Sequence, residues 1–486
     1  MFFNYFYNYR FYSLNFKNLQ IETQVMTPKL MCTQHPDTTV KITAAEEVDE
    51  ALVGHTAYGC DEVMIDYEGK TTPYSQPKDI TVKAKEADLP LGEKFFLTPR
   101  MPNPRLEEFE RAMLTLEAAV LANYFSVKLM GRQAIRWVVL PMVADIDTLY
   151  LVYRMLQHKS RIYEQELGIK WEPIEIVPLV EDAHAQLKIE DMLASFMNKL
   201  EEKPQRIRLF LGKSDSAVKY GHIASALSIV LTLAKTPQIE ERFGVRIHPI
   251  LGMGSPPFRG GINNPQLAHL EVLQYSGYYT VTIQSAVRYD VSYNEYVNVK
   301  ESLLAACCVR GVKAVDPELY QIITQASSNY RGVVAKYADK IVEVARLVPP
   351  TRDRVSWNVY GRSLTLHDRV VNMPRAIVYT STWYAMGLPP ILLDAPTVVE
   401  LARGDKLDLL LRALPAYRKE VQYDAQFYDP AIAERYVGED FVKIVNEALD
   451  YLDVRDRAAG TYLALLRMYR NESNIIAMAK YRKFLG

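Results

Sequence analysis

The stretch RIRLFLGKSD, residues 206–215, is an apolar run that ends in charged and small polar side chains. Its apolar residues do not alternate strictly with polar ones, which is typical of a parallel strand covered on both faces. The stretch therefore predicts a buried strand that ends near Gly212 and is followed by polar residues.

Seven other runs of this kind precede residue 290. Their starts lie roughly 30 to 40 residues apart, the spacing expected when each strand is followed by a helix. The runs are KLMCTQHP (29–36), EVMIDYEG (62–69), KFFLTPR (94–100), RWVVLPMV (136–143), IEIVPLVED (174–182), RIHPILGMG (246–254) and YYTVTIQSAVR (278–288).

Helical periodicity separates these runs. In residues 105–123, one helical face carries Leu106, Phe109, Met113 and Leu116. Residues 217–234 repeat this spacing, and residues 265–277 begin with proline and end with glycine, as helices often do. Eight alternating strands and helices predict an α/β protein with a TIM-like (β/α)8 barrel. The alternative, an open doubly wound sheet, is disfavoured because no GxGxxG motif follows the first run.

The pattern divides the chain into three parts. Residues 26–290 hold the predicted catalytic barrel. Residues 291–486 are predicted to be mainly helical and integral to the barrel and to oligomer contacts, from helical periodicity in 395–414, 440–453 and 456–483. Residues 1–25 form an aromatic arm without the features of a signal peptide. We expect this arm to be disordered, an oligomer contact or absent from the mature protein.

The composition excludes several classes of partner. Hydrophobic residues make up 49% and charged residues 24% of the 486 positions, as in ordinary folded proteins. The net charge of −1 supplies no field that attracts nucleic acid or an anionic membrane, so an anionic ligand requires a local cluster of arginines. No run reaches transmembrane length, so no membrane partner is expected.

The cysteines predict a reduced, cytoplasmic protein. Cys32, Cys60, Cys307 and Cys308 have no zinc-like CxxC spacing. Neighbouring cysteines such as the last two rarely bridge each other, so free thiols are the expectation.

Chemically capable side chains gather where the predicted strands end. In barrel enzymes the reacting groups lie at the carboxyl ends of strands. This set contains a base, carboxylates able to hold a hard cation, and several arginines. Its members are His35, Asp66, Glu68, Arg100, Glu181, Asp182, Asp215, Arg259 and Arg288.

The segment GMGSPPFRGG, residues 252–261, follows the seventh run, where barrels often bind phosphate. Gly260 and Gly261 allow backbone N–H groups to approach an anion, and Arg259 adds a guanidinium fork. The alternative is a surface loop with a solvated arginine. Arg100 and Arg288 are further substrate-binding candidates, with salt bridges at the barrel rim as the alternative.

Glu181 and Asp215 end neighbouring strands and are candidate ligands for Mg²⁺ or Mn²⁺. The alternative is that each caps the helix that follows it. Asp66 and Glu68 share one side of a strand and are expected to orient Arg100 or Lys70.

His35 precedes Pro36, which excludes it from the middle of a helix. A single histidine is more often structural than catalytic. Its place at the end of the first strand, on the edge where carboxylates and arginines gather, favours a role in proton transfer.

Six blocks of the chain resemble the signature blocks of archaeal-type phosphoenolpyruvate carboxylases, the type 2 family. The resemblance extends from about residue 29 to residue 486 and leaves out the aromatic arm. The blocks are MCTQHPDTT, GCDEVMIDYEGK, FFLTPRMPNP, RLFLGKSDSAVKYG, GMGSPPFRGG and VTIQSAVRYD.

The long bacterial and plant carboxylases are more distantly similar. Their TAHPT, SDSxKD and GRGGxxGRGG blocks resemble TQHPD, KSDSAVK and GMGSPPFRGG, and their LRAIPW block resembles PRAIVY, which makes Arg375 a further phosphate-binding candidate. This chain has Leu251 where the long form carries a histidine before its glycine loop. Its last residues, KYRKFLG, do not match the QNTG tail, so inhibition by aspartate or malate is not carried over.

The resemblance implies carboxylation of phosphoenolpyruvate by bicarbonate to give oxaloacetate and phosphate, by a homotetramer that uses Mg²⁺ or Mn²⁺. It implies carboxyphosphate and a metal-stabilised enolate as intermediates, with His35 as the proton acceptor and Arg259, Arg100 and Arg375 around the phosphoryl group. One alternative is another Mg²⁺-dependent barrel lyase or aldolase acting on phosphoenolpyruvate or pyruvate enolates. A barrel scaffold without catalytic activity is a second, which the full set of strand-end groups disfavours.

Overall fold

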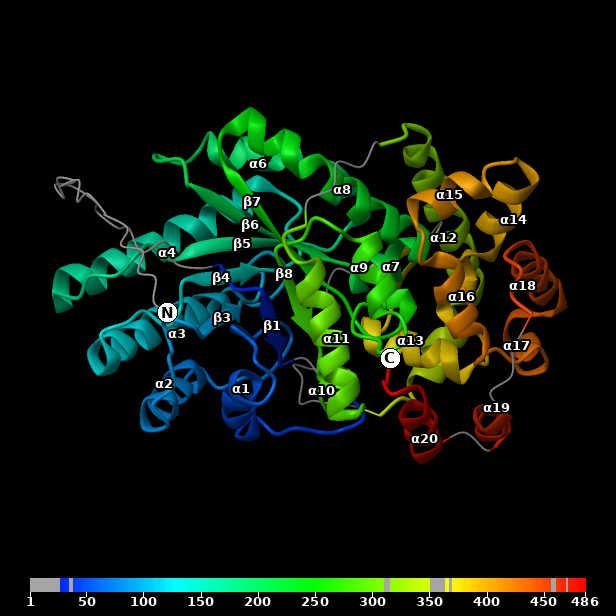
Figure 1. Cartoon of the computed structure of the whole chain (residues 1–486), viewed down its shortest axis with the longest axis horizontal. Helices are drawn as coiled ribbons and strands as arrows, with labels where there is room; N and C mark the ends of the chain where they lie inside the picture. Colours follow the sequence, from blue (N-terminus) through cyan, green and yellow to red (C-terminus); the bar gives the residue numbers. More distant parts are fainter. Residues whose placement is uncertain are drawn as a thin grey trace, which may run out of the picture.

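Eight parallel strands close into a barrel in the described part of the chain, which comprises residues 27–34, 38–309, 315–349, 363–366, 369–455, 460–468 and 471–486 of this computed structural model (Figure 1). Each strand pairs with its neighbours in the sequence, and β1 pairs with β8. The strands are β1 (Leu30–Thr33), β2 (Glu62–Asp66), β3 (Phe96–Arg100), β4 (Trp137–Leu140), β5 (Glu175–Val180), β6 (Arg206–Gly212), β7 (Arg246–Gly252) and β8 (Thr280–Ile283). All eight predicted runs contain a strand, and the predicted barrel is confirmed.

Helices connect the strands and cover the barrel on its outside (Figure 1). They are α1 (Glu46–Thr56), α2 (Gln76–Glu86), α3 (Phe109–Met130), α4 (Ile146–Leu167), α5 (Ala183–Leu187), α6 (Ile189–Met197), α7 (Ser214–Tyr220), α8 (His222–Phe243), η1 (Pro257–Arg259), α9 (Ala268–Gln274) and α10 (Ser285–Tyr289). The apolar face expected for residues 105–123 is only partly buried. Leu106 and Phe109 are exposed, because the face of α3 that meets the barrel is built around Leu116 and small alanines.

The single helix expected over 217–234 is two helices, α7 and α8, separated at Gly221. Gly221 has φ 86°, and a Cβ there would lie 2.5 Å from Oδ1 of Asp394. Asp394 comes from the C-terminal region and accepts a hydrogen bond from the Ile223 amide at 2.8 Å, which caps the start of α8. The break is therefore fixed by a residue distant in sequence.

Burial of Asp394 should make stability depend on pH. Burial raises the pKa of this carboxyl to about 7, although the Ile223 amide acts in the opposite direction. A raised pKa stabilises the folded state at low pH, and this contribution is lost as pH rises from about 4 to 7. Asp394→Asn keeps the capping oxygen and lacks the titration. The free energy of unfolding is measured by urea denaturation for the variant and for wild type. The difference between them is expected to grow in favour of the variant by up to about 4 kcal/mol as pH rises from about 4 to 7. A difference that does not change with pH would contradict this.

The barrel interior is a separate core from the one between strands and helices. It contains Met31, Met64, Phe96, Trp137, Val139, Val177, Leu179, Phe210 and Ile250. At its amino-terminal end, Arg208 donates to Glu62 at 2.7 and 2.8 Å and lies against the Trp137 ring. Arg208, one of the two arginines in the predicted run 206–215, thus forms a buried ion pair near the amino-terminal end of the barrel.

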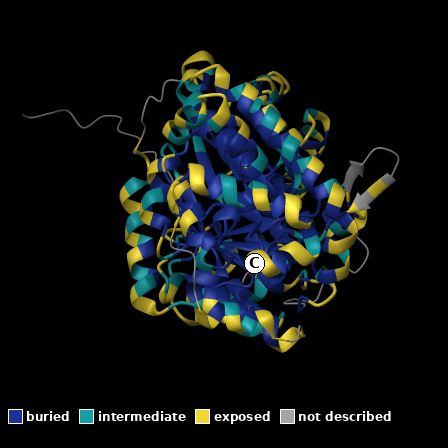
Figure 2. Cartoon of the chain, turned by 90° about the vertical axis from the view of Figure 1, so that its right-hand side faces the viewer, coloured by how far each residue is buried: buried dark blue, intermediate teal, exposed yellow. Residues whose placement is uncertain are grey.

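The C-terminal region is mainly helical, as predicted, and packs directly on the barrel. Its longest helix, α12, lies against α7 and α8, and α16 reaches η1. In Figure 2, which faces this region, buried residues fill the centre and exposed ones lie on the outer helices. Its elements are α11 (Tyr293–Ala306), α12 (Glu318–Ala345), β9 (Ser363–Leu366), β10 (Arg369–Asn372), α13 (Ala376–Ala385), η2 (Pro390–Asp394), α14 (Ala395–Arg403), α15 (Leu407–Ala413), α16 (Tyr417–Ala425), α17 (Pro430–Val437), α18 (Glu439–Tyr451), α19 (Gly460–Arg467) and α20 (Glu472–Arg482).

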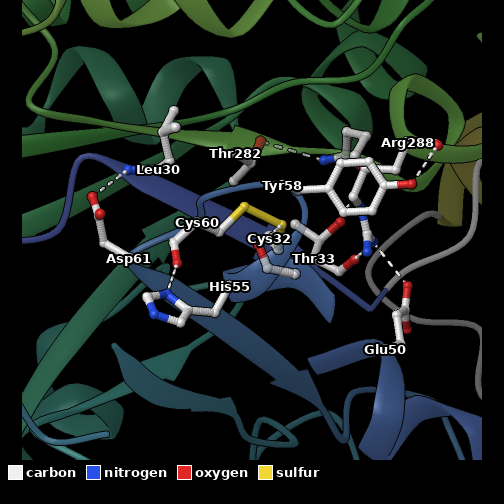
Figure 3. Close-up of a disulfide and its surroundings, with 12 residues drawn as sticks. Leu30, Cys32, Thr33, Glu50, His55, Tyr58, Cys60, Asp61, Thr282 and Arg288 are labelled. Carbon is white, nitrogen blue, oxygen red and sulfur yellow. Dashed lines mark hydrogen bonds and ion pairs between the residues drawn. A yellow bond between two sulfur atoms is a disulfide. The ribbon is translucent and has the colours of Figure 1, made fainter. Parts of the chain in front are cut away.

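Cys32 and Cys60 form a disulfide, so the expectation of free thiols is wrong for this pair (Figure 3). Their Cα atoms lie 5.9 Å apart because β1 and β2 are neighbours, with Cys32 paired to Val63. Cys307 and Cys308 are free thiols. Disulfides are rare in the cytosol of mesophiles but common inside hyperthermophilic archaea, so the bond does not decide the compartment.

Helix α3 alone, among the described helices, is long and apolar enough to cross a bilayer, with a mean hydropathy of 1.2. It packs between α2 and α4 on the outside of the barrel. A bent pair, Ala376–Ala385 with Pro390–Arg403, passes the same test when its members are taken together. The predicted arm 1–25 lies outside the described residues, as does His35.

Candidate active site

Five of the predicted site residues line one pocket at the carboxyl ends of the strands. They are Arg100, Glu181, Asp215, Arg259 and Arg375. The other lining residues are Thr33, Met64, Glu68, Leu179, Phe210, Gly212, Ser214, Gly252, Thr282, Gln284, Ala376 and Ile377. Because parallel strands of a barrel all end on the same face, groups far apart in sequence meet there.

Arg100 is held in place by two carboxylates of β2 and the loop after it. Its Nε donates to Asp66 at 2.9 Å, and its terminal nitrogen lies 2.7 Å from Glu68. Burial acts to lower the pKa of Arg100, but these two carboxylates outweigh it and raise the pKa well above its usual value. Asp66 and Glu68 therefore orient Arg100, whereas Lys70 pairs with Glu47.

Arg259 reaches the pocket from η1, in the loop that was predicted to bind phosphate. Its Nε donates to Ser214 Oγ at 3.0 Å, and a terminal nitrogen donates to the backbone oxygen of Gly486. A Cβ on Gly254 would lie 2.9 Å from the Arg259 guanidinium carbon, so the loop needs glycine there for the arginine to fold across it. Arg259 is 4% exposed and fixed on both sides.

Gly260 and Gly261 use their amides within the loop. The Gly260 amide donates to the Pro257 carbonyl at 2.7 Å, and that of Gly261 donates to Pro256 at 3.1 Å. Neither glycine belongs to the described residues that line the pocket. In this loop, therefore, the guanidinium of Arg259 is the group presented to an anion.

Arg375 comes from the C-terminal region, at the start of α13, and lies 3.9 Å from Glu68. Ala376 and Ile377 of the same helix also line the pocket. The barrel alone therefore does not complete the site, and the C-terminal region supplies one wall.

Glu181 and Asp215 follow the neighbouring strands β5 and β6, whose pairing ends with Val180 opposite Leu211. A Cβ on Gly212 would lie 2.6 Å from Glu181 Cγ, so glycine leaves the space that the Glu181 side chain occupies. Asp182 caps α5 by accepting from the amides of His184 and Ala185, both at 3.1 Å. Since Asp182 is the cap, the capping alternative for Glu181 is disfavoured.

The carboxylate pair fits a hard divalent cation that takes its remaining ligands from substrate and water. Among the residues that the structure describes, no three His, Cys, Asp or Glu side chains form a complete protein cage for a metal. The lining holds three arginines and three carboxylates, so their formal charges cancel. A cation would supply the positive charge that a multiply charged anion requires.

Arg288 lies behind the pocket, outside the set of described lining residues. It donates to the Thr33 carbonyl at 2.6 Å and pairs with Glu50 at 2.9 Å (Figure 3). β8 ends at Ile283, and α10 then carries Arg288 across to β1. Its observed role is to fix the end of the strand that leads to His35.

Sequence reasoning missed four polar lining residues, Thr33, Ser214, Thr282 and Gln284. Gln284 donates to Thr282 Oγ1 at 3.3 Å, and Thr33 donates to Gln284 at 3.4 Å. These residues lie at or near strand ends, close in sequence to the charged candidates. That position is the feature of the sequence that could have indicated them.

Comparison with known proteins gives a consistent result over nearly the whole chain. A family model described as phosphoenolpyruvate carboxylase matches residues 27–486. The phosphoenolpyruvate carboxylase of Pyrobaculum islandicum is 72% identical over 461 residues, covering 95% of this chain and all of the relative. That of Methanosarcina mazei is 30% identical over 521 residues, covering 94% of this chain and 99% of the relative.

Among solved structures, Haloferax volcanii malate synthase in a pyruvate/acetyl-CoA ternary complex matches with a TM-score of 0.43 and 14% identity, covering 86% of this chain and 97% of the other. That likeness is too low to support an inference. The family model and the relatives suffice, and the chain belongs to the phosphoenolpyruvate carboxylase family.

Proposed function

We propose that this chain carboxylates phosphoenolpyruvate with bicarbonate to give oxaloacetate and phosphate, with Mg²⁺ or Mn²⁺. The observation that carries the proposal is the convergence of Arg100, Arg259 and Arg375 with Glu181 and Asp215 in one pocket of a chain from this family. Anion-binding and cation-binding groups in one pocket suit a phosphorylated enol acid.

Each group has a defined role in the proposed reaction. Arg259, with Arg100 and Arg375, holds the phosphoryl group while bicarbonate attacks it, which gives carboxyphosphate and the pyruvate enolate. Glu181 and Asp215 would hold the divalent cation, which would supply positive charge to stabilise a developing enolate. His35 accepts the proton of carboxyphosphate, and the CO₂ released adds to the enolate. Thr33, Thr282 and Gln284 form a hydrogen-bonded wall of the pocket.

Bicarbonate dependence tests the proposal. In an assay coupled to malate dehydrogenase, NADH oxidation is expected only when phosphoenolpyruvate and bicarbonate are both present. An aldolase or another lyase acting on the same enolate does not need bicarbonate. Product formation in its absence would overturn the proposal.

The assembly proposed from the resemblance is a homotetramer, and the cytoplasmic location proposed for it comes from the pattern of cysteines. Size-exclusion chromatography with light scattering measures this state directly, and a monomer as the active species would contradict it. The net charge of −1 gives no support for a nucleic-acid partner.

Gly254→Ala is expected to raise the KM for phosphoenolpyruvate by about tenfold, because the added Cβ displaces the Arg259 guanidinium. The effect on kcat should be smaller, and steady-state kinetics separates the two. Gly332→Ala is the control, because Gly332 lies in α12 with nothing within 4 Å of an added Cβ. It should leave KM unchanged and add about 0.5–1 kcal/mol of stability. Equal KM values in the two variants would contradict the account.

Glu181→Gln and Asp215→Asn are expected to raise the concentration of Mg²⁺ or Mn²⁺ needed for half-maximal activity at least about tenfold, since each removes a charged ligand. Metal titrations of activity at saturating phosphoenolpyruvate provide the measurement. Asp182→Ala is the matched control: it removes the cap of α5, at a cost of about 1 kcal/mol, without touching the pocket. If Glu181→Gln and Asp215→Asn have the same metal requirement as Asp182→Ala and wild type, Glu181 and Asp215 are not ligands.

A further inference from the structure

A cluster of buried ionisable side chains lies directly behind the loop that carries Arg259. It consists of Lys213, His222, Glu271, Asp394 and Glu420, each at most 1% exposed. They come from the link between β6 and α7 and from α8, α9, η2 and α16, so five separate segments contribute. Burying charged groups is costly unless they are paired and hydrogen-bonded, so a cluster of this size calls for an explanation.

The cluster contacts the loop on both sides of Arg259. His222 Nδ1 lies 3.1 Å from the Pro257 carbonyl oxygen and 3.3 Å from Lys213 Nζ, which itself donates to the Phe258 carbonyl at 3.4 Å. On the other side, Glu271 Oε1 would lie 2.5 Å from a Cβ on Gly261. The loop therefore rests on the cluster immediately before and after the arginine.

The rest of the cluster holds these two side chains in place. Lys213 Nζ also donates to Ser225 Oγ at 3.0 Å and to the His222 carbonyl at 3.4 Å. His222 Nε2 lies 3.1 Å from Glu420.

Lys213 also joins the two halves of the proposed site. It immediately precedes Ser214, which accepts from Arg259, and Asp215, the candidate metal ligand. Its amide donates to the Gly252 carbonyl at 3.1 Å, at the end of β7. Lys213 thus connects the segment that carries Asp215 to the loop that carries Arg259. Small displacements of substrate-positioning groups can lower the reaction rate strongly.

We propose that Lys213 and His222 are positioning residues, which fix the Pro257 and Phe258 carbonyls and thereby hold Arg259 against Ser214 and directed into the pocket. Neither residue lines the pocket in the described part of the chain, so they act through Arg259 and not on the substrate. The inference rests on the proposed function in one respect, that Arg259 binds phosphoenolpyruvate.

Two substitutions of His222 separate positioning from packing. His222→Asn keeps an amide donor near the place of Nδ1, toward Pro257. His222→Gln places its amide nearer the place of Nε2, toward Glu420, and loses the contact with the loop. Lys213→Met removes the donor to Phe258 while keeping a similar side-chain length. All three variants disturb the cluster and should lower the melting temperature.

The readout is the dissociation constant of phosphoenolpyruvate with Mg²⁺, measured by calorimetry on the full chain without bicarbonate. It is expected to rise about tenfold or more in His222→Gln and Lys213→Met, and to stay within about threefold of wild type in His222→Asn. In turnover, the KM for phosphoenolpyruvate should rise in the same two variants while the KM for bicarbonate stays constant.

Equal weakening in His222→Asn and His222→Gln would overturn the proposal, since packing alone would then explain the effect. Unchanged binding in both His222→Gln and Lys213→Met would also overturn it. If His222→Gln does not fold, the comparison of Lys213→Met with Glu420→Gln decides, because Glu420→Gln leaves both loop contacts in place and should bind normally. Absence of phosphoenolpyruvate binding to wild type would instead count against the proposed function.

Discussion

Replacing Arg259 with glutamine is expected to lower kcat/KM for phosphoenolpyruvate by about a hundredfold to a thousandfold. The side chain is buried, its Nε is bound to Ser214, and the formal charges of the pocket lining cancel while it is present. Removing the guanidinium leaves one excess negative charge opposite an anionic substrate, in a site where water screens poorly. Steady-state kinetics with phosphoenolpyruvate as the varied substrate gives the value.

Two further variants define what the guanidinium contributes. Arg259→Lys keeps the charge but not the planar fork, so an intermediate loss is expected. Arg242→Gln removes an arginine of α8 that is 62% exposed and paired with Glu190 on the surface, and should leave kcat/KM unchanged. If Arg259→Gln retained activity within tenfold of wild type, the phosphate-binding role of the loop would be wrong.

The barrel could be predicted because its signal is local. A parallel strand that is covered on both faces produces a continuous apolar run, and the eight runs stand at a regular spacing. The break at Gly221 could not be predicted, because it depends on Asp394, 173 residues later in the chain. The disulfide between Cys32 and Cys60 depends in the same way on the pairing of β1 with β2.

The site residues that could be predicted from the sequence pattern are those that the barrel topology brings together. Arg100, Glu181, Asp215 and Arg259 meet because strand ends share one face, whereas Arg375 was found only through the family resemblance. Arg288 lies on α10, beyond the end of β8, and contacts the end of β1 behind the pocket, which the sequence pattern did not indicate. The cluster around His222 gave no signal, since its partner Glu420 lies 198 residues away.

His35→Asn is expected to change the product and not only the rate. Without a proton acceptor, carboxyphosphate does not release CO₂ beside the enolate, and the enolate takes up a proton to become pyruvate. Phosphate release should continue, because carboxyphosphate is hydrolysed by water to bicarbonate and phosphate, while oxaloacetate formation falls by about a hundredfold or more. Parallel assays coupled to lactate dehydrogenase and malate dehydrogenase measure pyruvate and oxaloacetate separately.

The ratio of the two products is the quantity that identifies the base. A substitution that only disturbed folding would lower pyruvate and oxaloacetate together, because both arise from the same phosphoryl transfer. His158→Asn, at an exposed position on α4, is the control and should form oxaloacetate alone. Oxaloacetate formation by His35→Asn at near the wild-type rate would assign the proton transfer to another group. If the variant makes pyruvate and still releases phosphate, the arginines and carboxylates of the pocket must still support phosphoryl transfer without His35. Phosphoryl transfer and carboxylation would then depend on different residues of the same site.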